Sequence, residues 1–170
     1  MIRRLTPADW LAFRDIRLEM LRQEPDAYGS PYSDWAERPE AMIREWLTRM
    51  QTFASIDGNR ILACAALSRA QNPLTAHRAE VIAVYTRQEA RGQGRMRAIL
   101  TCMAAEARRQ GILQLELQVA DWNEVAIAAY EQIGFRRYGV LPRAVRREAA
   151  FGDDILMAWP LDADAATLPG

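Results

Sequence analysis

Residues 80–119 constrain the fold more than any other part of the sequence. Residues 80–86 (EVIAVYT) are mostly apolar and β-branched and predict a strand, whereas residues 96–110 place apolar side chains at helical spacing. Residues 113–119 form another apolar run and predict a second strand. Strands joined through a helix lie parallel, because the helix returns the chain to the edge where the first strand began. The sequence therefore predicts an α/β protein with at least one parallel strand pair.

The other elements follow from periodicity and from turn residues. Thr6 is the expected N-cap, and Pro7 the first residue, of a helix that runs to residue 23. Gly134 is expected to end a later helix, with Phe135 making the hydrophobic contact of a Schellman cap. The remaining predictions are strand 2–5, loop 24–31, a helix after Pro39, strands 53–56 and 61–67 around the turn at 57–59, loop 71–76, helix 123–133, and strands 136–141 and 149–159.

Composition narrows the possible classes of protein. The 170 residues carry 22 basic and 22 acidic side chains, so no net charge favours nucleic acid or a membrane surface. No apolar run is long enough to span a bilayer, and the N-terminal residues do not resemble a signal peptide. Cys64, Cys102 and the single His77 show no spacing typical of metal ligands. We expect one reduced, cytoplasmic domain over residues 1–160, with a flexible tail at 161–170 and no metal.

A glycine turn lies between the predicted strand 80–86 and the helix that follows it. Residues 91–96 read Arg-Gly-Gln-Gly-Arg-Met. A helix N-terminus presents backbone N–H groups and a partial positive charge, and glycine lets a diphosphate approach the backbone closely. A plain tight turn is the alternative. A Rossmann fingerprint is excluded because Arg97 occupies the place of the third glycine, and a Walker loop is excluded because the chain contains no lysine.

Two segments resemble the sequence motifs of the GNAT superfamily of N-acetyltransferases. Residues 79–94 (AEVIAVYTRQEARGQG) are similar to the acetyl-CoA motif, in which a strand leads into Arg-Gly-x-Gly-x-Gly/Ala and a helix. Residues 123–135 (NEVAIAAYEQIGF) are similar to the second motif, N-x-x-A-x-x-x-Y-x-x-x-G-F. Segments 24–30 and 154–157 are also common in such chains, so the resemblance covers nearly the whole sequence. The departures are Thr86 for the usual Val, Gln88 for the usual Pro, and Met96 for the usual small residue.

This resemblance implies a fold, a co-substrate and a set of site residues. The fold would be a mixed, mostly antiparallel sheet with helices on both faces and a parallel pair that splays to admit CoA. The activity would be transfer of an acetyl group from acetyl-CoA to a primary amine that attacks the thioester directly in a ternary complex. The residues assigned to acetyl-CoA in this way are Val84, Tyr85, Thr86, Arg91, Gly92, Gln93, Gly94, Arg95, Met96, Asn123 and Tyr130.

Two residues are catalytic candidates through the same resemblance. Tyr130 is the candidate general acid, because a phenol can donate a proton to the departing thiolate, although it is also placed as a core aromatic. Glu80 is the candidate base acting through water, with an ordinary surface carboxylate as the alternative. His77 has a suitable pKa, but a lone loop histidine is more often structural. Asn123 is expected to cap its helix, to contact the pantetheine arm, or both.

Arginines are expected near the phosphates and the acceptor. Around the turn these are Arg87, Arg91, Arg95 and Arg97, each of which also suits a solvated helix face. In the closing hairpin the charged residues are Arg143, Arg146, Arg147, Asp153 and Asp154, and arginine there suits a carboxylate-bearing acceptor such as an amino acid. A non-catalytic acyl-CoA-binding or regulatory domain is the alternative function. The sequence leaves the acceptor and the oligomeric state open, a homodimer included.

Overall fold

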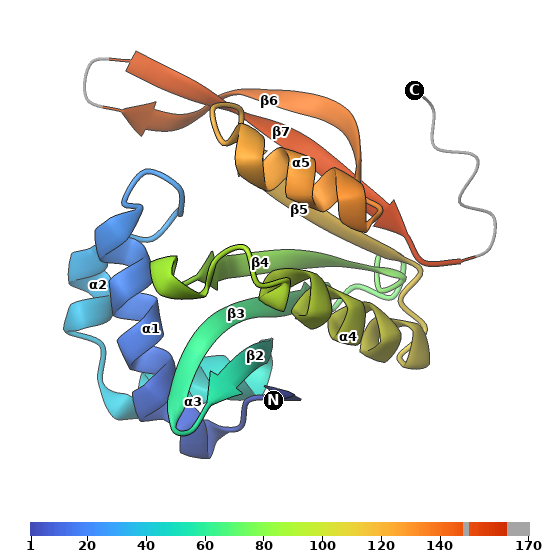
Figure 1. Ribbon diagram of the computed structural model, residues 1–170. Coiled ribbons are helices and arrows are strands. Elements are labelled where there is room, and N and C mark those ends of the chain that lie inside the picture. The colour runs from blue at the N-terminus through green and yellow to red at the C-terminus, as the bar shows by residue number, and fades with distance from the viewer. Residues whose placement is uncertain (148–149, 163–170) are drawn as a thin grey trace. The chain divides into compact units, whose positions relative to one another are not determined.

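A computed structural model describes residues 1–147 and 150–162 of the chain (Figure 1). The strands form one mixed sheet in the order β1-β2-β3-β4-β5-β7-β6. The elements are β1 (Ile2–Arg4), a 3₁₀ helix (Pro7–Asp9), α1 (Trp10–Gln23), α2 (Tyr32–Ala36), α3 (Glu40–Arg49), β2 (Gln51–Asp57), β3 (Arg60–Arg69), β4 (Arg78–Thr86), a 3₁₀ helix (Gln88–Ala90), α4 (Arg95–Arg109), β5 (Gln114–Ala120), α5 (Glu124–Ile133), β6 (Arg136–Arg147) and β7 (Ala150–Pro160).

The chain divides into two compact units, and both β4 and α4 contribute to each of them. Unit 1 comprises Met1–Ser68 and Ile82–Met103. Unit 2 comprises Arg69–Val81 and the chain from Ala104 onward. The glycine turn belongs to unit 1, whereas Glu80, Asn123 and Tyr130 belong to unit 2.

Unit 1 begins with the predicted cap. Thr6 precedes the helix and Pro7 is its first residue, as expected, but the first turn is 3₁₀ and α1 proper begins at Trp10. The Asp9 carboxylate accepts a 2.7 Å bond from the Thr6 amide and pairs with Arg3. The hydrogen bond from Arg3 is the main reason that the pKa of Asp9 lies far below its usual range. These bonds fix the start of α1 against β1.

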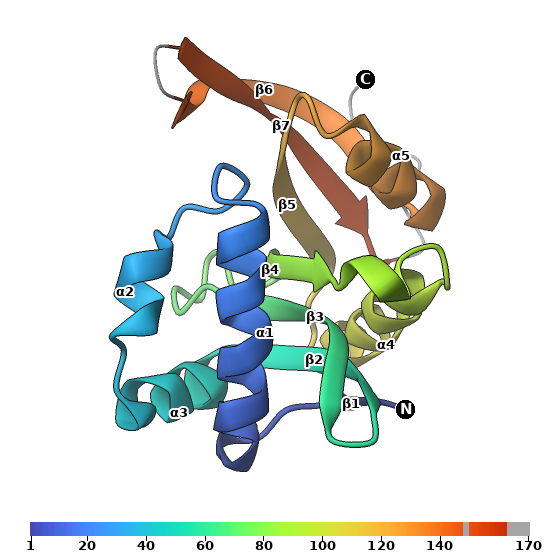
Figure 2. The same cartoon turned by 60° about the vertical axis from the view of Figure 1, so that its left-hand side comes forward.

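The sheet of unit 1 is covered on both faces. β2 and β3 pair antiparallel around the tight turn predicted at 57–59, where Gly58 has a φ of 55°. Consecutive residues of both strands are buried, which requires protein on each side. Alternate residues, Ala54, Cys64 and Ala66 among them, pack into one core with α1, α2 and α3. These three helices lie together on one side of the strands (Figure 2).

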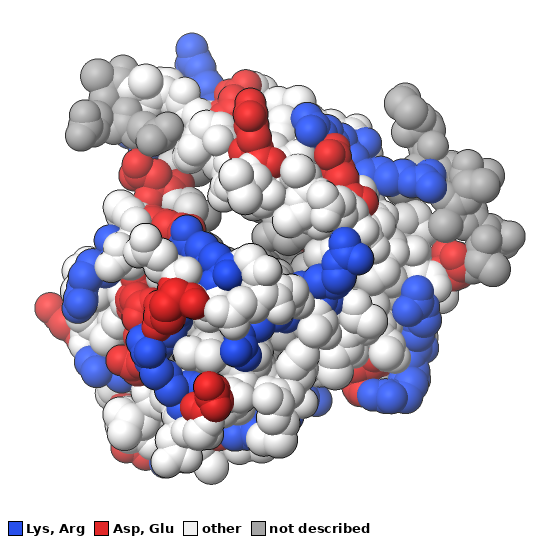
Figure 3. All heavy atoms as spheres, in the orientation of Figure 1, with Lys and Arg blue, Asp and Glu red and all other residues white. Residues whose placement is uncertain are grey.

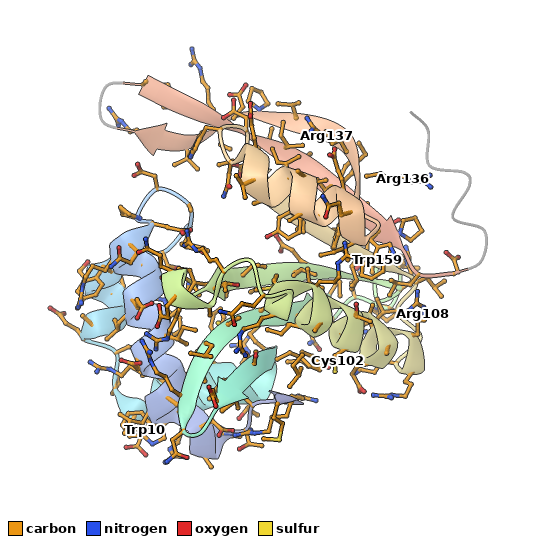
Figure 4. All side chains as sticks on the ribbon, viewed as in Figure 1. Trp10, Cys102, Arg108, Arg136, Arg137 and Trp159 are labelled. Atoms are coloured by element: carbon orange, nitrogen blue, oxygen red, sulfur yellow. The ribbon has the colours of Figure 1, made fainter. Side chains whose placement is uncertain are left out.

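Unit 2 contains the parallel pair that the sequence predicts. Residues 78–80 of β4 pair in parallel with residues 114–116 of β5, and β5, β7 and β6 then pair antiparallel. At the end of α5 the amides of Gly134 and Phe135 donate to Glu131 and Tyr130, and Gly134 has a φ of 131°. This is the predicted Schellman cap. Trp159 of β7 packs on Phe135, with ring centres 5.5 Å apart, at this end of α5 (Figure 4).

Several boundaries differ from those predicted. α2 falls in a segment with no predicted element, because five residues are too few to show helical periodicity. β6 extends six residues beyond the predicted end at 141. Two register shifts, at 137–139 and 141–145, interrupt the alternation of side chains between the two faces of the strand. The full length of β6 therefore does not show as a strand pattern in the sequence.

The described chain remains packed just beyond the end of β7. Leu161 is buried, its amide donates to Leu113, and its carbonyl accepts from Arg108 (Figure 4). Packing therefore extends to the first residue of the expected tail, and residues 163–170 lie outside the described part of the chain. No helix within the described residues has both the length and the apolar character needed to cross a bilayer.

Candidate functional site

The glycine turn adopts a conformation that glycine favours strongly. Gly92 and Gly94 have φ angles of 71° and 70°, in the left-handed region that most side chains avoid. Among the described residues, no atom outside the adjacent residues lies within 4 Å of where a side chain would begin at either position, so this side of the backbone is open. The α4 ladder begins with a 3.0 Å bond from the Ala98 amide to the Gly94 carbonyl. The amides of a first helical turn have no partner within their helix and can hold an anion.

The side chains of the turn are held by polar contacts. Arg95 donates to Ser55 of β2 and to Gln93, both at 3.0 Å. The Gln93 amide in turn donates to the carbonyl of Glu89. Arg91 donates to the Thr86 carbonyl and pairs with Glu24. Arg91 is half exposed, and its guanidinium is accessible from solvent at the glycine turn.

Arg87 does not belong to the predicted phosphate-binding set. Its side chain is 2% exposed, and its guanidinium pairs with Asp15 and Glu19 of α1. Its Nε also donates to the carbonyl of Ile61, at 2.7 Å. The exposed position predicted for Arg87 is wrong, because this arginine is buried and fastens α1 to β3 and to the residue after β4.

The end of β4 is bent and its carbonyls are engaged. Ala83 has a φ of 52°, a conformation that costs energy for alanine and that redirects the strand. The Cys64 thiol donates to the Ala83 carbonyl at 3.7 Å, and the Tyr28 hydroxyl donates to the Val84 carbonyl at 2.7 Å. Together with the bond from Arg91 to Thr86, these contacts fix the peptide planes of the strand end. Fixed planes hold the neighbouring N–H groups in set directions, as a polarising site requires.

The Tyr85 side chain lies in the core, with Arg91 of the turn over its ring. It is buried, and its hydroxyl lies 3.1 Å from a carboxylate oxygen of Glu19. Burial, followed by the charge of Glu24, raises the pKa of this phenol. Any contact of Tyr85 with a ligand therefore involves its backbone, as the sequence predicts for residues 84–86.

In unit 2, Glu80 belongs to a group of ionisable side chains. Its register partner on β5 is Glu116, which accepts a 2.8 Å bond from Arg78. Partial burial and the charge of Glu116 raise the pKa of Glu80 above its usual range. Burial, Glu116 and Glu80 also raise the pKa of Tyr138 on β6. A carboxyl group with a raised pKa is suited to proton transfer at neutral pH.

Tyr130 and Asn123 are the two named residues of the second motif. The Asn123 side chain accepts a 3.2 Å bond from the Ala126 amide, so the predicted helix cap is confirmed. Tyr130 is 8% exposed, and its ring meets that of Phe135 edge to face at 5.7 Å. Both predicted placements of Tyr130, core aromatic and motif residue, are compatible with this geometry.

Other candidates are placed less favourably for chemistry. The backbone of His77 supports β5, since its carbonyl accepts from the amides of Leu113 and Gln114. In the hairpin, the Arg143 amide donates to Asp153, and its guanidinium lies over the ring of Phe151. Burial, with the charges of Asp121 and Asp153, raises the pKa of Asp154. The side chain of Arg147 lies outside the described part.

Three residues that contact or influence the candidate site residues were absent from the sequence prediction. They are Tyr28, Glu116 and Tyr138. Tyr28 lies within segment 24–30, which resembles the family. The resemblance marked this segment but assigned no function to Tyr28. Both Glu116 and Tyr138 lie far from Glu80 in sequence: Glu116 is found through strand register, and Tyr138 through its electrostatic interaction with the two glutamates.

The charges on the visible face are mixed in sign, with arginines beside acidic groups over both units (Figure 3). Within the described ranges, no group of three His, Cys, Asp or Glu side chains is arranged to hold a metal ion. The candidate groups of unit 1 are backbone amides and arginines, and those of unit 2 are Glu80, Asn123 and Tyr130.

These features define an α/β protein with an open, left-handed glycine turn between a strand end and a helix N-terminus. A profile of the acetyltransferase (GNAT) family matches residues 10–135, and the chain belongs to this family. No curated protein matches the sequence.

Solved structures share the fold at low sequence identity. A GNAT-family acetyltransferase from Streptococcus pneumoniae superposes with a TM-score of 0.84 at 19% identity, covering 95% of this chain and 99% of that one. The putative acetyltransferase yncA from Salmonella typhimurium, solved with its cofactor acetyl-CoA, gives 0.80 at 19% identity, covering 100% and 97%. A GCN5-related N-acetyltransferase from Kribbella flavida gives 0.77 at 24% identity, covering 94% and 96%. The mixed sheet with one parallel pair is thus confirmed as the fold of this family.

Proposed function

We propose that the chain is an acetyl-CoA-dependent N-acetyltransferase that acetylates a primary amine by direct attack in a ternary complex. The observation that carries the proposal is the turn at Gly92 and Gly94, which is left-handed, open, and placed between a strand end and a helix N-terminus. Family membership supports acetyl transfer, and the acetyl-CoA bound by yncA supports the co-substrate.

In this proposal the diphosphate of acetyl-CoA binds the amides of the turn and of the first turn of α4. Arg91, Arg95 and Arg97 supply positive charge beside it. The backbone of Val84, Tyr85 and Thr86 pairs with the pantetheine arm and polarises the thioester carbonyl. Asn123 contacts the same arm with the part of its amide that is not used for capping.

The reaction is an acyl substitution. A neutral amine attacks the thioester carbon, a C–N bond forms, and the C–S bond breaks as the tetrahedral intermediate collapses. Glu80 receives the proton lost by the incoming ammonium, through a water molecule. Tyr130 donates a proton to the CoA thiolate, and the second proton, which the nitrogen loses as the tetrahedral intermediate collapses, returns through water to the Tyr130 phenolate. The products are an N-acetyl amide and CoA.

The alternative is a domain that binds acyl-CoA without catalysis. An enzyme needs a base where a binding domain does not, and Glu80, whose pKa is raised by partial burial and by the charge of Glu116, is the candidate for it. The two functions are separated by calorimetric titration with acetyl-CoA followed by an amine screen that detects released CoA thiol. Binding with turnover supports the enzyme. Binding with no turnover on any amine favours the alternative, and a failure to bind acetyl-CoA overturns both.

A further inference from the structure

Unit 1 buries a guanidinium that has no acidic partner. Arg17, in the middle of α1, is 4% exposed. Its Nη1 donates to the sulfur of Met20, but its buried Nε has no hydrogen-bond partner. Within the described residues, no carboxylate lies within ion-pair distance of Arg17. A buried charge without a counterion is costly, so such groups are normally paired.

Aromatic rings surround this guanidinium and bring two more donors. Its Cζ lies 4.7 Å from the ring centre of Trp35, 5.8 Å from that of Trp46 and 5.7 Å from that of Tyr28. The two indole rings lie 5.3 Å apart, and the Nε1 group of each is buried without a hydrogen-bond partner. Three unsatisfied N–H donors therefore gather in one cluster, which we call the Arg17 cluster (Arg17, Trp35 and Trp46).

The surroundings make this cluster more positive rather than less. Arg38 lies over the ring of Trp35 at 4.2 Å. Its positive charge repels that of Arg17 and lowers the pKa of Arg17. Burial is the main cause that lowers the pKa of Arg17, and the other groups acting on it are the neutral acids Cys64 and Tyr28. An arginine stays protonated at neutral pH even so. What the cluster lacks is one negative charge with oxygen acceptors.

A carboxylate fits this requirement better than a phosphate. The planar guanidinium matches the two oxygens of a carboxylate, and one negative charge balances one buried positive charge. A phosphate carries about 1.5 to 2 negative charges at neutral pH. It would leave excess negative charge buried among the aromatic rings. We propose that the Arg17 cluster binds the carboxylate group of the acetyl acceptor, which makes the acceptor an amino acid or a similar amine that bears a carboxylate.

The cluster adjoins the strand end to which the proposed function assigns the thioester. Tyr28, whose ring lies beside Arg17, donates its hydroxyl to the Val84 carbonyl. Cys64, which is coupled electrostatically to Arg17, donates to the carbonyl of Ala83. A carboxylate held by Arg17 thus leaves the rest of a small acceptor near β4. This inference rests on the proposed function, because it assigns the acceptor of that reaction.

The test measures binding without turnover. The protein, saturated with CoA, is titrated calorimetrically with a panel of amino acids, each paired with the carboxamide that replaces its carboxylate. At least one amino acid is expected to bind about tenfold or more tightly than its carboxamide, as loss of a charged hydrogen-bond partner implies. Equal affinities within every pair, or no binding by any member, overturn the proposal and leave ordered water as the occupant.

Substitutions that keep an aromatic ring but remove the N–H donor then locate the site. Trp35→Phe and Trp46→Phe each remove one N–H donor. Each is expected to weaken binding of the amino acid severalfold and to leave binding of its carboxamide unchanged. Trp10→Phe is the matched control, because Trp10 also lies under an arginine but outside the cluster (Figure 4). Arg17→Met is expected to abolish the difference in affinity between the amino acid and its carboxamide. An equal effect of Trp10→Phe, or no effect of both cluster variants, contradicts the assignment.

Kinetics distinguish the acceptor from a separate effector. The acid that lacks the amino group should inhibit competitively against the amino acid, and non-competitive inhibition assigns the carboxylate to an effector and overturns the proposal. Acetyl-CoA affinity is measured in parallel. If acetyl-CoA fails to bind while the amino acid still prefers its carboxylate form, the proposed function fails and the cluster remains a carboxylate site without an acceptor role.

Discussion

The hydroxyl of Tyr28 donates a 2.7 Å hydrogen bond to the carbonyl of Val84. This bond joins the loop after α1 to the bent end of β4, one residue beyond Ala83 and its positive φ. It holds the peptide plane between Val84 and Tyr85, whose amide is among those expected to polarise the thioester. A loop outside the two main sequence motifs therefore contributes to the geometry of the proposed site.

Tyr28→Phe should lower kcat severalfold and leave the affinity for acetyl-CoA nearly unchanged. The substitution removes the restraint on the peptide plane but none of the amides that bind the diphosphate. The stability loss should be about 1 kcal/mol, the usual contribution of one hydrogen bond. Steady-state kinetics, calorimetry and urea unfolding check these three quantities. Tyr32→Phe, which removes a hydroxyl bonded to Arg22 in α1, is the control and should leave kcat unchanged.

Gly94→Val should weaken acetyl-CoA binding at least about tenfold without unfolding the protein. Valine is strongly disfavoured at a φ of 70°, so the turn must change shape and its amides turn away from the diphosphate. Calorimetric titration measures the affinity. Gly29→Val is the control, because Gly29 has open space around it and its φ is not in the left-handed region. An unchanged affinity in the Gly94 variant would remove the turn from the binding site.

Arg87→Met should destabilise the protein by about 2–4 kcal/mol. This is slightly less than the usual cost of about 3–5 kcal/mol for breaking a buried ion pair. Arg87 is buried, but Asp15 is 68% exposed, so water compensates part of the lost interaction. Thermal unfolding followed by circular dichroism measures the change. Arg91→Met, at a half-exposed pair, should cost less than about 1 kcal/mol. A similar small loss in both variants would contradict the clamp assigned to Arg87.

Tyr130→Phe should keep most of the affinity for acetyl-CoA and lower turnover. The ring contact with Phe135 is retained, and only the hydroxyl is lost. Calorimetry and a thiol-release assay report the two quantities. An unchanged rate would assign protonation of the thiolate to another group or to water, whereas equal losses of affinity and rate would indicate a structural role.

The parts of the fold that follow from local pattern were predictable. The apolar stripe of α4, from Ile99 to Ala107, and the turn glycines were read from spacing and residue type, and the structure confirms both. The parallel pair followed from the order strand, helix, strand. These features depend on residues close together in the sequence.

The parts that depend on tertiary contacts were not predictable. Arg87 and Arg91 look alike in the sequence, and only the position of α1 makes one a buried clamp. The positive φ of Ala83 has no residue signature, since alanine rarely adopts it. The Arg17 cluster is assembled from three helices, so no single window contains its pattern. Residues of this kind are found by asking which buried polar groups lack partners.

The role of Glu80 is tested by the pH dependence of the rate. A primary amine is mostly ammonium at neutral pH, and only the neutral amine attacks. If Glu80 accepts the proton through water, Glu80→Gln should lower the rate strongly near pH 7, with a defect that shrinks as the pH approaches the pKa of the amine. Because burial and Glu116 raise the pKa of Glu80, the folded state holds its proton to higher pH than the unfolded state does. Its charge therefore opposes folding at neutral pH, and the glutamine variant should be no less stable.

Glu116→Gln supplies the matched test of the same mechanism. It removes the charge that raises the pKa of Glu80 and frees Arg78, and both changes favour the ionised form of Glu80. A base must be deprotonated to act, so the acidic limb of the kcat/KM profile should move to lower pH while the plateau is retained. Profiles are recorded for wild type and both variants with one acceptor. If the profile of Glu80→Gln runs parallel to that of wild type and Glu116→Gln shifts no limb, Glu80 is not the base, and His77 or a chain of water molecules becomes the next group to test.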